Sequence, residues 1–174
     1  LIRRLGLSAD VASFARLEIR NAADGAPEAW LDGTRLALAI SLTDRAGWAV
    51  CALAPEGVGL GCDLELVEPR SAAFVRDYLT EAERERVACA GDEDESHLLA
   101  NLLWSAKESA LKVLHTGLRR DTRSVEVDLG PTGRERVAAA ADGWQPLAVR
   151  ATEGREFAGW WRRYGTFVLT FATD

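Results

Sequence analysis

Two separate segments of the chain carry three acidic residues whose spacing suits the binding of a metal ion and a phosphate. Asp63 and Glu65 stand two positions apart in an otherwise apolar stretch, so a strand would project both from one face. Glu108 supplies a third carboxylate from further along the chain. Burial and mutual repulsion make the ionised form of neighbouring carboxylates unfavourable unless a cation lies between them. Oxygen ligands without a soft donor suit magnesium, which also takes water and substrate phosphate.

Lys112 and Trp104 extend this pattern. Each lies one helical turn from Glu108, so a helix would present all three on one face. A lysine in that place can hold a phosphate as a point charge, and together the residues indicate metal-assisted chemistry on a phosphate ester. Taken singly they are also typical of plain structure: a solvated strand face, a surface ion pair on a helix, or a core tryptophan.

A strand, a hairpin and a long helix must position these residues. The strand is expected over 58–67. Apolar runs at 36–40 and 48–53 predict a hairpin before it. The helix is expected over 96–115, because leucines recur on one face and Gly117 takes the position of a C-terminal glycine.

The remaining elements complete an α+β fold, with helices packed on antiparallel sheet. Residues 21–33 are rich in Ala, Asp, Gly and Pro and are expected to form a loop. Helical spacing over 71–79 predicts a further helix, and Thr80 to Glu83 match a capping box that begins another. Four segments rich in Val, Phe, Trp or Thr are expected to be strands: 124–129, 147–152, 156–162 and 166–173.

The composition favours a globular protein of one domain and disfavours nucleic-acid-binding and membrane-spanning proteins. The chain has 174 residues, of which 48% are hydrophobic and 28% charged, which suits a single domain with a buried core. The formal charge of −6 disfavours nucleic-acid binding. No apolar run reaches the roughly 20 residues that cross a membrane. Three cysteines without paired spacing are typical of a reduced, cytoplasmic protein.

The chain contains no methionine and starts with Leu1-Ile2-Arg3-Arg4. We expect it to act as a monomer or as part of a larger polypeptide. The missing methionine favours the second, for example a synthase that carries its own carrier domain.

Two motifs resemble those of 4′-phosphopantetheinyl transferases. Gly61-Cys62-Asp63-Leu64-Glu65 is similar to the family's Gly-x-Asp-x-Glu motif. The segment 104–112, Trp-Ser-Ala-Lys-Glu-Ser-Ala-Leu-Lys, resembles its second signature, Trp-Ser-x-Lys-Glu-Ser-x-x-Lys. The order and separation also fit, and the resemblance covers 36–127 well. It implies an enzyme that transfers the 4′-phosphopantetheine group of coenzyme A to a serine of an acyl or peptidyl carrier protein, releasing 3′,5′-ADP.

The placement of the first motif resembles the longer branch of the family, the surfactin-synthetase-activating type. In that branch one chain forms two similar halves, a pseudodimer, with the active site between them. Asp63 follows about a third of the chain, as in a compact form of this branch. The resemblance implies one domain over 1–174, with halves of about 1–58 and 59–174, each an antiparallel sheet packed with helices.

The resemblance also implies roles for the site residues. Asp63, Glu65 and Glu108 would ligate magnesium together with the diphosphate of coenzyme A. Lys112 would contact phosphate oxygens and take part in catalysis. Glu108 is in addition a candidate base for the serine hydroxyl, either directly or through a metal-bound water.

Further coenzyme contacts are expected from the N-terminal part and from the second motif. Arg35 occupies the place of a family segment that often carries a coenzyme-binding Lys or Arg. Thr43 keeps a hydroxyl of the family's Ser-x-Ser-His segment. Asp44 replaces its histidine, and would repel phosphate unless it is turned away or paired with Arg45. Lys107 is either a solvated lysine or a contact for phosphate or carrier.

Carrier proteins are usually acidic, so arginines that flank the motifs could steer them: Arg70, Arg119, Arg120 and Arg123. Two other functions stay open. The substitution at Asp44 favours a catalytically impaired carrier-binding module of a larger synthase. A metal-dependent phosphoesterase would instead release phosphopantetheine without a carrier.

Overall fold

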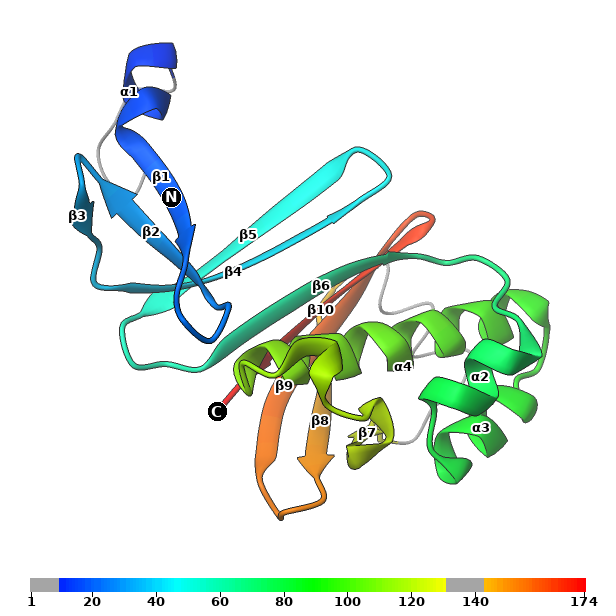
Figure 1. Ribbon diagram of the computed structural model, residues 1–174. Coiled ribbons are helices and arrows are strands. Elements are labelled where there is room, and N and C mark those ends of the chain that lie inside the picture. The colour runs from blue at the N-terminus through cyan, green and yellow to red at the C-terminus, as the bar shows by residue number, and fades with distance from the viewer. Residues whose placement is uncertain (1–9, 131–142) are drawn as a thin grey trace.

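The computed structural model describes residues 10–130 and 143–174, and its centre is a five-stranded antiparallel sheet with the strand order β6-β10-β9-β8-β7 (Figure 1). Residues Leu1 to Arg4, which carry the sequence's unusual beginning, lie outside the described part. The five strands run as follows: β6, Leu60–Leu66; β10, Phe167–Thr173; β9, Glu156–Tyr164; β8, Gln145–Ala151; and β7, Val125–Asp128.

One long helix, α4 (Glu93–Val113), covers one face of this sheet (Figure 1). Asp92 caps its N-terminus by accepting a hydrogen bond from the Glu95 amide, so the helix begins three residues before the predicted start at 96. Its leucine-rich face packs on the buried side chains of the strands and forms the main core. The helix that the periodicity predicts is therefore confirmed, and it presents Glu108 and Lys112 to the sheet edge.

The shorter helices pack beside α4. α2 (Ala72–Tyr78) and α3 (Glu81–Ala88) lie between β6 and α4 in the sequence, and Figure 1 shows them beside the N-terminal part of α4. The capping box predicted at Thr80 and Glu83 is present, with each residue's side chain bonded to the other's backbone amide. Two short 3₁₀ turns follow α4, at Gly117–Arg119 and Thr122–Ser124.

The N-terminal part is richer in strands than the sequence indicated. After α1 (Val11–Arg16) come the strands of a three-stranded sheet: β1, Leu17–Asn21; β2, Pro27–Leu31; and β3, Thr34–Arg35. The expected loop over 21–33 is therefore wrong over β2. Pairing with β1 overrides the turn-rich composition there, because every β2 residue has a partner in β1.

The predicted hairpin is confirmed as β4 (Leu38–Arg45) and β5 (Trp48–Pro55). β4 packs along β6 without joining its hydrogen-bonded sheet. Instead, two side-chain hydroxyls of β4 accept hydrogen bonds from β6 amides: Ser41 Oγ from Cys62 at 2.9 Å and Thr43 Oγ1 from Leu64 at 3.1 Å. These bonds fix the hairpin beside the strand that carries the first motif.

The fold is thus α+β, with antiparallel sheets and four α-helices in the described part of the chain. None of the helices there is both long and apolar enough to span a membrane.

Gly61 brings β6 against the backbone of α4. A Cβ atom at this position would lie 1.8 Å from the carbonyl oxygen of Ser109. We expect Gly61→Ala to push α4 away from the sheet and to lower the free energy of unfolding by about 1–3 kcal/mol or more, measured by urea denaturation. Gly143→Ala is the control, because nothing lies within 4 Å of its added Cβ, and it should change stability by less than about 0.5 kcal/mol.

Candidate active site

Asp63 forms the centre of a polar cluster between β6 and α4. Its Oδ1 accepts hydrogen bonds from Lys112 Nζ at 3.0 Å and from Thr43 Oγ1 at 3.3 Å. The side chain is buried, and its Oδ2 has no hydrogen-bond partner. Ser105 of α4 donates to the Asp63 backbone carbonyl, so strand and helix are bonded at the residue that carries the carboxylate.

Glu108 approaches this cluster from α4. Its Oε1 is buried and also lacks a hydrogen-bond partner. The pKa of Glu108 is raised to about 7, chiefly by burial and then by the charge of Asp63; Lys112 lowers it, and Glu65 makes a smaller contribution that raises it. All three predicted carboxylates therefore act on one another electrostatically, although Glu108 is distant from the other two in sequence.

Lys112 lies one turn after Glu108, as predicted from the sequence. Besides its bond to Asp63, its Nζ donates to the backbone carbonyl of Cys62 at 2.8 Å. An ammonium group has three donors, so one N–H remains beyond these two bonds. The side chain is partly exposed and reaches the adjoining cavity.

Glu65 differs from the other two carboxylates because both of its oxygens are engaged. Oε1 accepts from Trp104 Nε1 and Oε2 from Arg70, both at 2.9 Å, and Arg45 lies 3.4 Å away. Burial and then Asp63 raise the pKa of Glu65, while Arg70, Trp104 and Arg45 lower it. The arginines that contact Glu65 had no assigned place in this site from the sequence.

Arg70 is largely buried and is bonded to other residues of the protein, so its side chain is not available to a carrier protein. Its Nε donates to Oδ1 of Asn101 at 2.6 Å, and its side chain is only 16% exposed. Asn101 is fully buried and donates to two backbone carbonyls, those of Glu68 and His97. Asn101 was missed because a single polar residue on a leucine-rich helix gives no signal of its tertiary partner.

The structure corrects the expectation for Lys107. This lysine is neither solvated nor available to phosphate, because its side chain is completely buried on the α3 side of α4. Its Nζ donates to Glu83 Oε2 at 2.8 Å, to the carbonyl of Thr122 at 3.0 Å and to the carbonyl of Val125. Burial lowers the pKa of Lys107, and Glu83 partly offsets that effect.

The side chains of the three N-terminal residues that were expected to contact the coenzyme, Arg35, Thr43 and Asp44, do not lie together in the structure. Thr43 lies in the cluster, on Asp63. Asp44 is exposed and projects from the opposite face of β4, while its neighbour Arg45 bonds to Glu68. Asp44 is thus turned away and not paired with Arg45.

Arg35 lies on the rim of a cavity, but its guanidinium is bound by Glu28 at 2.7 Å and by Glu56 at 2.6 Å. Both carboxylates raise the pKa of Arg35. A phosphate at this residue would have to compete with two carboxylates for it.

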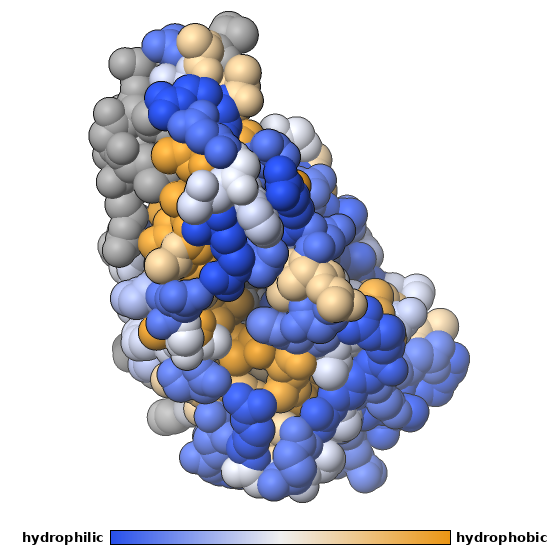
Figure 2. All heavy atoms as spheres, turned by 60° about the vertical axis from the view of Figure 1, so that its left-hand side comes forward, coloured by the Kyte–Doolittle hydropathy of each residue, from blue (hydrophilic) through white to orange (hydrophobic). Residues whose placement is uncertain are grey.

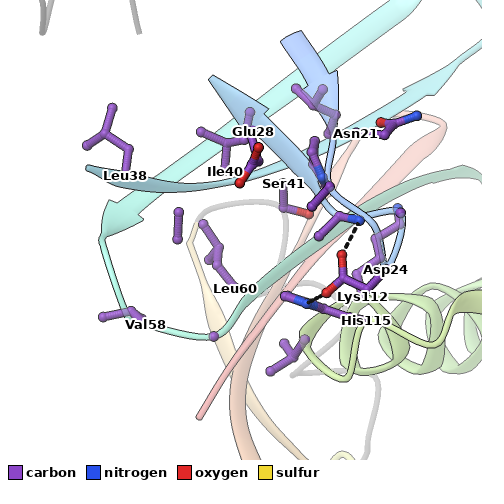
Figure 3. Close-up of a pocket in the computed structure, with 18 of the residues that line it drawn as sticks. Asn21, Asp24, Glu28, Leu38, Ile40, Ser41, Val58, Leu60, Lys112 and His115 are labelled. Atoms are coloured by element: carbon purple, nitrogen blue, oxygen red, sulfur yellow. Dashed lines mark hydrogen bonds and ion pairs between the residues drawn. The ribbon is translucent and has the colours of Figure 1, made fainter. Parts of the chain in front are cut away.

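This cavity, of about 770 Å³, adjoins the cluster on the side of Lys112. Its walls come from the β1–β2 turn, from β4, from the start of β6 and from the end of α4 (Figure 3). Leu38, Ile40, Val58 and Leu60 supply apolar lining. On the face where the N-terminal strands come forward, Figure 2 shows apolar surface exposed between hydrophilic side chains.

The β1–β2 turn closes one side of the cavity by contacting the end of α4. Asp24 Oδ2 lies 2.7 Å from His115 Nδ1, and Figure 3 shows the two side chains pointing toward each other. Arg119 donates to the carbonyls of both residues. The other two flanking arginines form surface ion pairs, Arg120 with Glu153 and Arg123 with Asp121.

A family model supplies the decisive comparison. The model of the 4′-phosphopantetheinyl transferase superfamily matches residues 59–171, a range that runs from β6 to β10 and contains both motifs. The chain belongs to this superfamily. Comparison with curated proteins gives no match. Membership implies a transferase of phosphopantetheinyl groups, with coenzyme A and carrier proteins as the substrates of the family.

The range that matches the phosphopantetheinyl transferase model contains some of the predicted site residues and leaves out others. Asp63, Glu65, Glu108 and Lys112 all lie within the matched range. Thr43, Asp44 and Arg35 lie outside it, and of these only Thr43 is bonded to the cluster.

The donor set also allows a test for magnesium. Within residues 10–130 and 143–174, no three His, Cys, Asp or Glu side chains are grouped as direct ligands of one ion. Two hard oxygens, Asp63 Oδ2 and Glu108 Oε1, are nevertheless buried without partners. Buried polar atoms are costly when unsatisfied. Two such carboxylate oxygens fit a magnesium ion that completes its shell with water and phosphate.

The raised pKa of Glu108 predicts the pH dependence of stability in the presence of a chelator. The folded protein holds this proton up to about pH 7, whereas the ordinary value is 4.5. The associated stability is fully present below pH 4.5 and is lost as the pH rises through 7, by at most about 3 kcal/mol. Urea unfolding between pH 4.5 and 8 measures this loss.

Glu108→Gln should flatten that dependence, since its amide does not titrate. Glu126→Gln, which changes an exposed glutamate of β7, should keep the wild-type slope. An unchanged slope in Glu108→Gln would contradict the assigned environment of Glu108.

Proposed function

We propose that this protein is a magnesium-dependent phosphopantetheinyl transferase that modifies a serine of an acyl or peptidyl carrier protein with the 4′-phosphopantetheine of coenzyme A. The observation that carries the proposal is that Asp63 and Glu108 are coupled electrostatically and each has a buried, unpartnered oxygen, while the ammonium of Lys112 is bonded to Asp63. The family match supports phosphopantetheinyl transfer in general, and the carboxylates support the metal.

Asp63 and Glu108 would hold the ion through their unpartnered oxygens. Bound magnesium supplies charge neutralisation on the diphosphate of coenzyme A, as a Lewis acid. Glu65 is expected as a third ligand, but it would have to exchange its bond to Arg70 or to Trp104 to reach an ion directly.

Lys112 would bind the diphosphate with its remaining N–H. Its two existing bonds, to Asp63 and to the Cys62 carbonyl, hold the ammonium in a fixed place between the carboxylates and the cavity. A phosphate there gains a charge-assisted hydrogen bond without any need to reorganise the lysine.

Glu108 would accept the proton of the carrier serine, directly or through a water molecule. The serine oxygen then forms a bond to the phosphorus of the phosphopantetheine group, and the bond from that phosphorus to the bridging oxygen of 3′,5′-ADP breaks. The departing nucleotide keeps the electron pair. Because a bound cation lowers the basicity of a carboxylate that ligates it, the route through a water molecule is the one that we favour.

The coenzyme would occupy the cavity beside Lys112, where apolar side chains can cover its pantetheine arm and nucleoside. This placement is part of the proposal that the chain is a compact form of the surfactin-synthetase-activating type, with halves of about 1–58 and 59–174 and the site between them. The cavity supports it, because its walls come from both sides of residue 58.

A catalytically impaired carrier-binding module is the second candidate. Two observations favour it: Asp44 replaces the expected histidine and is turned away, and Arg35 is bound by two glutamates. Such a module would bind an apo carrier protein but would transfer nothing to it.

The transfer itself is tested with Glu108→Ala. Incubation with coenzyme A, Mg²⁺ and an apo carrier protein should add the mass of phosphopantetheine to the carrier, as measured by mass spectrometry. We expect the variant to lose about 100-fold or more of this rate, with its circular dichroism unchanged. Undiminished turnover would reject Glu108 as the base, and free phosphopantetheine without carrier modification would indicate a phosphoesterase.

Magnesium is tested by calorimetry with coenzyme A. Mg²⁺ should tighten coenzyme binding to the wild type. Asp63→Asn should weaken Mg²⁺ binding by at least about tenfold, since loss of groups that only orient metal ligands already costs that much. Asp77→Asn, at an exposed residue of α2, should leave it unchanged. Equal Mg²⁺ affinity in Asp63→Asn and wild type would remove Asp63 from the metal site.

A further inference from the structure

A second ionic cluster lies on α4, inside the protein and apart from the carboxylates. Lys107 is 0% and Glu83 2% exposed. The three donors of Lys107 go to Glu83, to the Thr122 carbonyl and to the Val125 carbonyl. Glu83 in turn accepts from the amide of Thr80 at 2.8 Å, and from the amide of Val127. Every N–H of the buried ammonium therefore has an oxygen acceptor.

These bonds join four elements. Glu83 and Thr80 belong to the start of α3, Thr122 to the 3₁₀ turn before β7, and Val125 and Val127 to β7 itself. All of them meet at one side chain of α4. The pair is thus a directional junction between the long helix and the elements that pack on its side.

Stability alone gives no reason for this pair. Desolvating two charges costs several kcal/mol each, and replacement of a buried ion pair by apolar residues is often neutral or stabilising. The apolar face of α4 already supplies a core of leucines. Apolar contact is not directional, so the rotation of α4 depends on its polar bonds. Ser105 and Lys112 supply such bonds to β6, and the fully bonded network of Lys107 supplies them on the α3 side.

Rotation of α4 matters because Glu108 is the next residue. Successive side chains on a helix project about 100° apart. With Lys107 bound on the α3 side, Glu108 is directed to the edge of β6, where Asp63 lies. Glu108 has no hydrogen bond at Oε1 to hold it there, and repulsion from Asp63 works against the approach.

We propose that Lys107 and Glu83 are positioning residues for phosphopantetheinyl transfer: their buried pair fixes the rotation of α4 so that Glu108 is held beside Asp63. This inference rests on the function proposed above. It assigns to the first lysine of the second motif a role distant from the substrate.

The test removes both charges together, in Lys107→Met/Glu83→Gln, so that neither is left buried alone. We expect the double variant to fold, with kcat reduced about tenfold or more and KM for coenzyme A within about threefold of wild type. Its Mg²⁺ affinity in calorimetry should fall by about fivefold or more. A purely structural pair would lower the melting temperature and leave the kcat and Mg²⁺ affinity of the folded protein unchanged, and that result would overturn the proposal.

An ion pair between β9 and the start of α4 provides a control at the surface. Arg163 NH1 lies 2.6 Å from Asp94 in the first turn of α4, at the surface. Arg163→Gln/Asp94→Asn also removes one charge of each sign, and should keep both kcat and Mg²⁺ affinity. If the control loses as much as the test variant, the effect comes from charge removal anywhere on α4, and the assignment to Lys107 and Glu83 is wrong.

A single substitution covers the case in which the double variant does not fold. Glu83→Asp keeps both charges, so that the buried ammonium is not left alone, but it draws the carboxylate away from its present partners, and should lower kcat by about threefold or more with KM unchanged. A wild-type kcat in this folded variant would overturn the proposal. Failure of the proposed function is recognised separately, because the wild type itself would then transfer nothing to the carrier.

Discussion

Electrostatic repulsion between buried carboxylates is the constraint that the rest of this structure must offset. Asp63, on a strand, and Glu108, on a helix, raise each other's energy when both are ionised, and burial adds to the cost. The fold imposes their approach through close contact of β6 and α4 at Gly61, through the Ser105 bond to the strand backbone, and through Lys112 between the two elements. A site under this kind of strain is typical of groups kept for chemistry instead of stability.

The sequence predicts most of what is local. Periodicity and capping residues locate β6, α4, the β4–β5 hairpin and the helix that begins after Thr80. Alternation along a strand and the spacing on a helix also predict that the motif residues face one another. The β1–β2–β3 sheet was missed, because its strands are short and turn-forming residues dominate the segment; only pairing between them makes it a sheet.

Tertiary partners are what the sequence could not provide. Lysines are rarely buried without a partner, so the sequence predicted that Lys107 is either solvated or in contact with phosphate or carrier. Its actual partner is Glu83, on another helix. Glu65 looks equivalent to Asp63 in the motif, yet Arg70 and Trp104 occupy its oxygens. Such differences depend on which side chains the fold brings together, and no local pattern encodes them.

The hydroxyl bonds from Ser41 and Thr43 to β6 have a consequence for self-association. β6 ends the five-stranded sheet, and a bare edge of this kind can add a strand from another molecule. Here the amides of Cys62 and Leu64 already have acceptors, supplied by side chains and not by a neighbouring backbone. These two amides of the edge strand are therefore not free to pair with a strand from another molecule. The strand that carries the first motif is protected in this way without any extension of the sheet.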